Sequence, residues 1–134
     1  HGSLYWKQHI YRKGLTNQSI ARIINDLGIK DEIVADSAEP KSIAEIKREG
    51  VWIVPAVKGK DSINYGIQML LDYPIKIHSQ SKDLIEEFSS YIWAKDRSGE
   101  STNKPIDKNN HAIDAGRYAV MRRLGKKKLE FDLV

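Results

Sequence analysis

The sequence predicts a single α/β domain with a partly parallel sheet whose strands are joined by helices. Short apolar runs alternate along the chain with longer segments in which apolar residues recur at helical spacing, as is typical of α/β folds. The 134 residues suffice for one compact domain but not for two ordinary ones. We therefore interpret residues 4–124 as the domain, residues 1–3 as the remnant of a tag and residues 125–134 as a basic C-terminal tail.

The first half of the chain alternates between predicted strands and predicted helices. Apolar runs, the first of them rich in aromatic residues, predict strands at 4–13, 32–35 and 51–54. Helices are predicted between them, from Thr16 to Gly28 and from Pro40 to Gly50, because each segment has a suitable first residue and a terminal glycine. The first helix should pack on the sheet through residues spaced i, i+3, i+4 and i+7, namely Ile20, Ile23, Ile24 and Leu27.

The second half continues the alternation and ends in a long helix. An apolar stripe predicts a helix from Ile63 to just before Pro74, and residues 75–78 predict a short strand. Ser81 is the expected N-cap of the next helix. The polar stretch 95–109 is interpreted as a loop, which at that length is usually functional or mobile, and a final helix is expected over residues 110–124.

Composition excludes several classes of protein. The absence of cysteine rules out disulfide scaffolds and thiolate zinc sites. No apolar run approaches the roughly 20 residues that a membrane span requires, so no membrane partner is expected. The net charge of +4 favours polyanions such as nucleic acid as partners, although many basic proteins never contact nucleic acid.

A first group of chemically active side chains follows the predicted strand at 32–35. Asp36, Glu39 and Lys41 lie at a strand-to-helix junction, where open α/β sheets tend to bind their ligands. Carboxylate oxygens suit hard cations such as Mg²⁺ or Mn²⁺. The competing interpretation, which spacing alone favours, is that Asp36 caps a turn and Glu39 offsets the dipole of the following helix.

A second group lies at the start of the last predicted helix. His111 and Asp114 are three residues apart, so they project from the same face and can share one ion. The alternative is a solvated first turn in which Asp114 is favoured by the helix dipole. Phosphodiester cleavage by two cations about 4 Å apart needs several acidic side chains from distant parts of the sequence. The residues near Asp36 and those near His111 together meet this need better than either set alone.

The order of these motifs resembles a known family. Residues 36–41, Trp93–Asp96 and Asn110–Ala115 with Arg117 and Tyr118 are similar to blocks in the C-terminal nuclease domain of phage large terminase subunits. The resemblance runs from about Tyr11 to Leu124, and the combination of blocks is more specific than any one of them.

The resemblance implies a ribonuclease H-like fold, with a mixed sheet flanked by helices, and an endonuclease that cuts concatemeric double-stranded DNA during packaging. It implies that Asp36, His111 and Asp114 are catalytic metal ligands for Mg²⁺ or Mn²⁺, with two ions in the intact domain. The family's opening strand, which carries a further aspartate, is expected before Leu4 and has no counterpart in this chain. We therefore expect weak metal binding and slow or absent cleavage by the chain as printed.

Partners and alternatives follow from the same resemblance. It implies the small terminase subunit and the portal protein as partners, in the cytoplasm of the infected bacterial host. A missing strand would expose sheet edges and favour a homo-oligomer.

The rival hypotheses are a resolvase-type or transposase-type ribonuclease H-like nuclease, and a DNA-binding or docking fragment without catalytic activity. The lysines that we expect to contact the DNA backbone are Lys41, Lys58, Lys60, Lys104 and Lys108.

Overall fold

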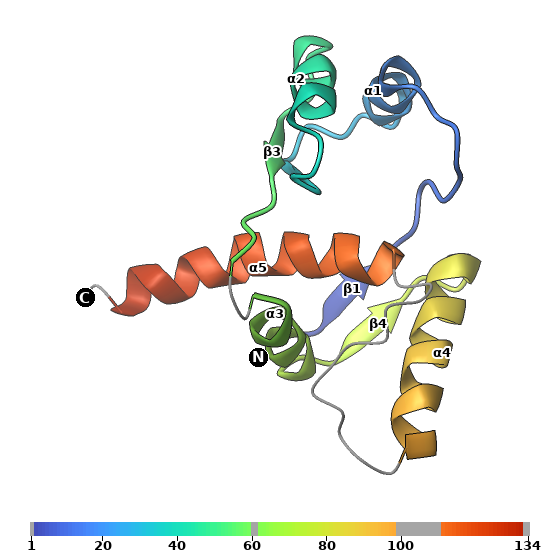
Figure 1. Ribbon diagram of the computed structural model, residues 1–134, viewed down its shortest axis with the longest axis vertical. Coiled ribbons are helices and arrows are strands. Elements are labelled where there is room, and N and C mark those ends of the chain that lie inside the picture. Colours follow the sequence, from blue (N-terminus) through green and yellow to red (C-terminus); the bar gives the residue numbers. More distant parts are fainter. Residues whose placement is uncertain (1, 60–61, 99–110, 133–134) are drawn as a thin grey trace.

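The computed structural model confirms the predicted α/β class (Figure 1). It describes residues 2–59, 62–98 and 111–132, and their side chains except for residues 91–98 and 126–132. Strands and helices alternate as the sequence predicts for most of this length. Their order is β1 (Leu4–Trp6), α1 (Asn17–Asp26), β2 (Ile33–Ala35), α2 (Pro40–Arg48), β3 (Ile53–Pro55), α3 (Ser62–Leu71), β4 (Ile75–Ile77), α4 (Lys82–Ser98) and α5 (His111–Asp132).

The described strands form two parallel pairs. β1 pairs with β4, with Leu4 opposite Ile75, and β2 pairs with β3, with Ile33 opposite Ile53. The expected parallel pairing is present, although the strands are divided between two small sheets instead of forming one mixed sheet. Figure 1 shows β3 with α1 and α2 at one end of the molecule, and β1 and β4 with α3 and α4 at the other.

The core of the first half lies between α1, α2 and the sheet formed by β2 and β3. Helix α1 begins after Thr16, whose Oγ1 accepts the Ser19 N–H at 3.0 Å, and is followed by Gly28 at a φ of 72°. Leu27, the C-cap of α1, is 46% exposed, contrary to the prediction that it packs on the sheet. The buried members of this core are Ala21, Ile24, Ile46, Val51 and Ile53.

Helix α5 connects the two halves of the molecule. It contacts α3 and α4 on one side and β2 on the other (Figure 1). Ile113 is buried, and Arg122 forms an ion pair with Glu32, next to β2, at 3.0 Å. Residues that lie far apart in the sequence are therefore held against one helix, and the start of this helix carries the second predicted group of site residues.

Three boundaries differ from the sequence predictions by more than two residues. β1 stops at Trp6, because Gln8 turns toward α4: its N–H donates to Ser81 Oγ at 2.8 Å, and its Oε1 accepts the Leu84 N–H at 3.0 Å. Helix α4 continues to Ser98, into the stretch that was expected to be a loop. Helix α5 continues through Gly125 and into the predicted tail. Within the described residues, no helix combines the length and apolar character needed to cross a membrane.

Candidate metal and DNA site

Asp36 lies at the carboxyl end of β2, in the turn that leads into α2. Its Oδ1 accepts the Ala38 N–H at 3.0 Å, so the carboxylate stabilises this turn as the structural interpretation of the motif expects. The parallel partner β3 ends at the same edge, and this brings Lys58 beside Asp36. The Lys58 Nζ and Asp36 Oδ1 atoms are 2.5 Å apart.

Asp36 is paired with the Lys58 ammonium, which stabilises its ionised form. The Lys58 ammonium, helped by the Ala38 N–H, lowers the pKa of the Asp36 carboxyl below its ordinary value. The same contact raises the pKa of Lys58. The Asp36 side chain is 56% exposed, so an ionised carboxylate remains accessible to a dissolved cation at neutral pH.

The second predicted group lies on the first turn of α5, as the sequence indicates. His111 is exposed, and the Asp114 side chain is 37% exposed. Asp114 Oδ1 lies 3.4 Å from the guanidinium of Arg117, a residue that is only 4% exposed. Both predicted ligands on α5 therefore remain accessible, with Asp114 oriented by a buried cation one turn later in the helix.

A chain of side-chain contacts connects the two predicted groups. Lys58, paired with Asp36, has its Nζ 5.9 Å from the centre of the Tyr118 ring. The Arg117 guanidinium carbon lies 4.8 Å from the same ring, and Arg117 in turn pairs with Asp114. Within the part of the chain that the structure describes, no three residues of the His, Asp and Glu types are grouped closely enough for one metal ion.

The remaining predicted residues have different surroundings. Glu39 is the exposed N-cap of α2 and accepts the Ser42 hydroxyl at 2.9 Å, without a side-chain bond to a helix N–H. Lys41 is exposed on the first turn of α2. The remaining predicted DNA-binding lysines, Lys60, Lys104 and Lys108, lie outside the described residues.

Sequence reasoning did not identify Glu87 as a residue of interest. It is 3% exposed on α4, and its carboxylate accepts the N–H groups of Ala112 and Ile113 at the start of α5. The available signal was its position three residues after Leu84 and one before Phe88, which places a carboxylate on the apolar stripe of α4. A charged residue in such a position is rarely buried without partners.

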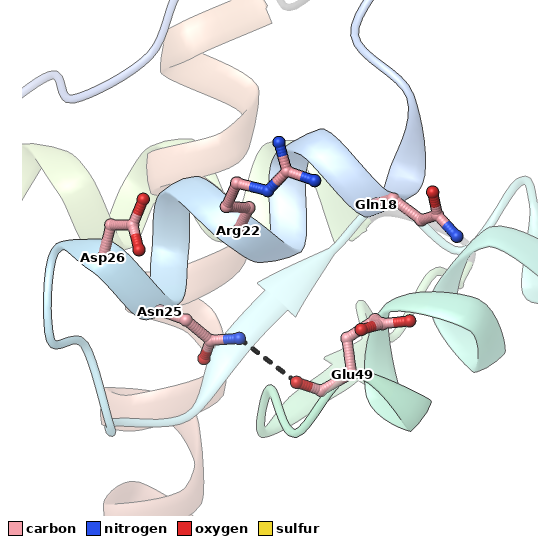
Figure 2. Close-up of a pocket in the computed structure, with 5 residues that line it drawn as sticks. All are labelled: Gln18, Arg22, Asn25, Asp26 and Glu49. Atoms are coloured by element: carbon pink, nitrogen blue, oxygen red, sulfur yellow. Dashed lines mark hydrogen bonds between the residues drawn. The ribbon is translucent and has the colours of Figure 1, made fainter.

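A separate polar pocket of about 370 Å³ lies between α1 and the end of α2. Figure 2 shows its lining, in which Asn25 Nδ2 donates to the Glu49 carbonyl oxygen at 3.1 Å. None of the predicted site residues lines this pocket; its lining consists of Gln18, Arg22, Asn25, Asp26 and Glu49. The pocket therefore belongs to a different part of the surface from the Asp36 edge.

Comparison with known proteins relates this arrangement to phage terminases. A family model described as the terminase RNAseH like domain matches residues 2–122. The terminase large subunit of Bacillus phage SPP1 is 38% identical over 98 residues, which are 70% of this chain and 23% of that protein. The PBSX phage terminase large subunit of Bacillus subtilis strain 168 is 27% identical over 119 residues, which are 87% of this chain and 27% of that protein. The chain thus spans less than a third of each relative's length.

A solved structure shows a similar fold. The crystal structure of the large terminase nuclease domain from bacteriophage SPP1, determined with bound Mn, matches with a TM-score of 0.77 and 30% sequence identity, over 89% of this chain and 70% of that chain. This match confirms the ribonuclease H-like fold that the sequence motifs implied. The family match over residues 2–122 and this structural likeness show that the chain belongs to the ribonuclease H-like nuclease domain family of phage large terminases.

Proposed function

We propose that the chain supplies the divalent-metal-dependent endonuclease activity of a DNA-packaging terminase, which cuts concatemeric double-stranded DNA. The observation that carries the proposal is the placement of Asp36 and Asp114 at the two ends of one series of side-chain contacts through Lys58, Tyr118 and Arg117. The Mn bound by the SPP1 nuclease domain supports the same chemistry.

The donor atoms of this chain fit a hard or borderline divalent cation. Asp36 offers an ionised and half-exposed carboxylate, and His111 and Asp114 offer an imidazole and a second carboxylate from one helical turn. We propose these three residues as ligands of Mg²⁺ or Mn²⁺, with two ions in the working site. Bound cations of this kind lower the pKa of a water molecule and stabilise the leaving oxygen of a phosphodiester.

We propose two roles for Lys58, one in the metal-free protein and one when a metal is bound. Its ammonium neutralises Asp36 in the metal-free protein at 2.5 Å. Because a cation at Asp36 would repel this ammonium, Lys58 is then released to contact a phosphate of the DNA backbone. Lys41, Lys60, Lys104 and Lys108 are proposed as further backbone contacts, which position DNA without reading its sequence.

Family membership also supports proposals about partners and location. We propose that the small terminase subunit and the portal protein are partners of the protein that carries this chain, in the cytoplasm of the infected bacterium. Copurification of the two partners with that protein from phage-producing cells supports this assignment. Their absence under conditions in which capsids are being filled argues against it.

Plasmid nicking tests the proposed activity. Supercoiled plasmid is incubated with Mn²⁺ and the protein that carries this chain, and the Asp36→Ala and Asp114→Ala variants are compared with Asp72→Ala. Asp72 is an exposed aspartate just after α3, so its variant is a control for loss of one surface charge. We expect the first two variants to lose nicking and the control to retain it. Continued nicking by both variants, or salt-sensitive DNA binding that is indifferent to metal and to Asp36, would exclude the proposed site.

A further inference from the structure

The first turn of α5 is held by a residue from another helix. Glu87 on α4 is 3% exposed, and its carboxylate faces the start of α5. Oε1 accepts the Ala112 N–H at 2.9 Å and the Ile113 N–H at 3.0 Å, while Oε2 lies 3.0 Å from the Ala112 nitrogen. Oε2 also accepts the Tyr11 hydroxyl at 2.7 Å. Both oxygens of this buried carboxylate are therefore hydrogen-bonded.

These bonds meet a requirement of the helix and of the carboxylate together. The first N–H groups of a helix have no partner within the helix, and their partial positive charge favours an anion. A buried carboxylate is strongly unfavourable unless donors surround it. Glu87 lies 25 residues before Ala112, so this cap fixes α5 relative to α4 and not only to its own flanking residues.

The two backbone donors lie between the proposed metal ligands. Ala112 and Ile113 directly follow His111 and directly precede Asp114. A change in the capping contact therefore alters the path of the backbone from which both ligand side chains project. Tyr11, from the segment between β1 and α1, fixes the opposite oxygen and so limits the rotation of the carboxylate.

We propose that Glu87 is a positioning residue for the metal site: its carboxylate holds the first turn of α5 so that His111 and Asp114 are presented toward Asp36. This inference rests on the proposed function, because it concerns the same ligands. Glu87 itself does not contact the metal or the substrate. Its hydrogen-bond partner Tyr11 acts through it.

The hydrogen bond to Glu87 also affects the Tyr11 phenol. The pKa of Tyr11 is raised from 10.0 to about 12, first because its hydroxyl donates to Glu87 and also because the Glu87 charge disfavours a phenolate. A charged carboxylate accepts stronger hydrogen bonds from helix N–H groups than a neutral acceptor does.

Metal affinity distinguishes a positioning role from a purely stabilising one. Mn²⁺ binding by the protein that carries this chain is measured by electron paramagnetic resonance, at a temperature at which every variant is folded. Glu87→Ala should weaken Mn²⁺ binding by roughly 10- to 100-fold, the loss found when partners of metal ligands are removed. Glu87→Gln, which keeps one acceptor oxygen, should have an intermediate effect. Thr16→Ala is the matched control, because it removes the N-cap of α1 and lowers stability without contacting α5.

Equal Mn²⁺ affinity in Glu87→Ala, Thr16→Ala and the wild type would overturn the inference. If Asp36→Asn weakens binding while Glu87→Ala does not, the positioning role alone is wrong. If neither substitution changes binding, the proposed function is wrong as well. If Glu87→Ala does not fold, Tyr11→Phe and Glu87→Gln are used instead, and amide hydrogen exchange in the first turn of α5 is measured without metal. Faster exchange together with weaker Mn²⁺ binding supports the positioning role. Faster exchange with unchanged Mn²⁺ binding refutes it.

Discussion

Gly116 provides a sharp test of how closely Trp6 packs against α5 beside Asp114. It lies between Asp114 and Tyr118, and the space that a Cβ would occupy is taken by the ring of Trp6, whose Cη2 and Cζ3 atoms overlap it and whose Cε3 lies at 3.0 Å. The Trp6 ring also packs edge-on against Phe88, at a centroid distance of 5.2 Å. Gly116→Ala therefore forces either Trp6 or α5 to move.

The magnitude follows from two opposing effects. Alanine favours a helix over glycine by roughly 0.8–1.0 kcal/mol, whereas overpacking of a well-filled site costs about 1–3 kcal/mol. Gly125→Ala is a matched control in the same helix, because nothing lies within 4 Å of its added Cβ. Since the helix-propensity gain is common to both variants, the difference between them measures the overpacking alone.

Thermal unfolding followed by circular dichroism at the helix band compares the two variants. Gly116→Ala should unfold at a lower temperature than Gly125→Ala, by roughly 4 °C for each kcal/mol of overpacking in a domain of this size. Gly125→Ala should unfold slightly above the wild type. Equal midpoints for the two alanine variants would refute the close packing of Trp6 on α5.

Three further outcomes are expected. Lys58→Met removes the ammonium paired with Asp36, so Mn²⁺ should bind more tightly, by no more than about fivefold because an exposed ion pair contributes little. Weaker binding would contradict the competition between Lys58 and the metal. Relative to Tyr11→Phe, wild-type stability in urea should be constant below pH 10.0 and fall as the pH rises toward about 12. The reason is that the phenol ionises near pH 10.0 in the unfolded chain but stays protonated in the folded protein, where it donates to Glu87. A difference that does not change with pH would contradict that bond. Arg122→Gln breaks a partly exposed ion pair and should lower the midpoint of urea unfolding only slightly. A large drop in the midpoint would contradict this small role.

Local signals in the sequence were sufficient for most elements. The Thr16 cap and Gly28 at positive φ set the limits of α1. These features depend on neighbouring residues, so a single sequence contains the information. The position of Asp36 at the end of β2 and of Asp114 on the first turn of α5 was predictable for the same reason.

Features that depend on distant contacts were not predictable in this way. The end of β1 at Trp6 follows from the bonds between Gln8 and the start of α4, more than 70 residues away. The cap on α5 comes from Glu87, and the pairing of Lys58 with Asp36 follows from the parallel alignment of β2 and β3. The sequence places Glu87 on the apolar stripe of α4, but its bonds to the start of α5 are seen only in the fold.

A double-mutant cycle on Mn²⁺ binding tests most directly whether Asp36 and Asp114 hold the same cation. Binding is measured for the wild type, Asp36→Asn, Asp114→Asn and the double variant, with Asp72→Asn as the control. If both carboxylates hold one cation, either single substitution removes most of the affinity, and the double variant binds little more weakly than the weaker single variant. Effects that simply add on a logarithmic scale, or affinities that match the control, would contradict a shared metal site.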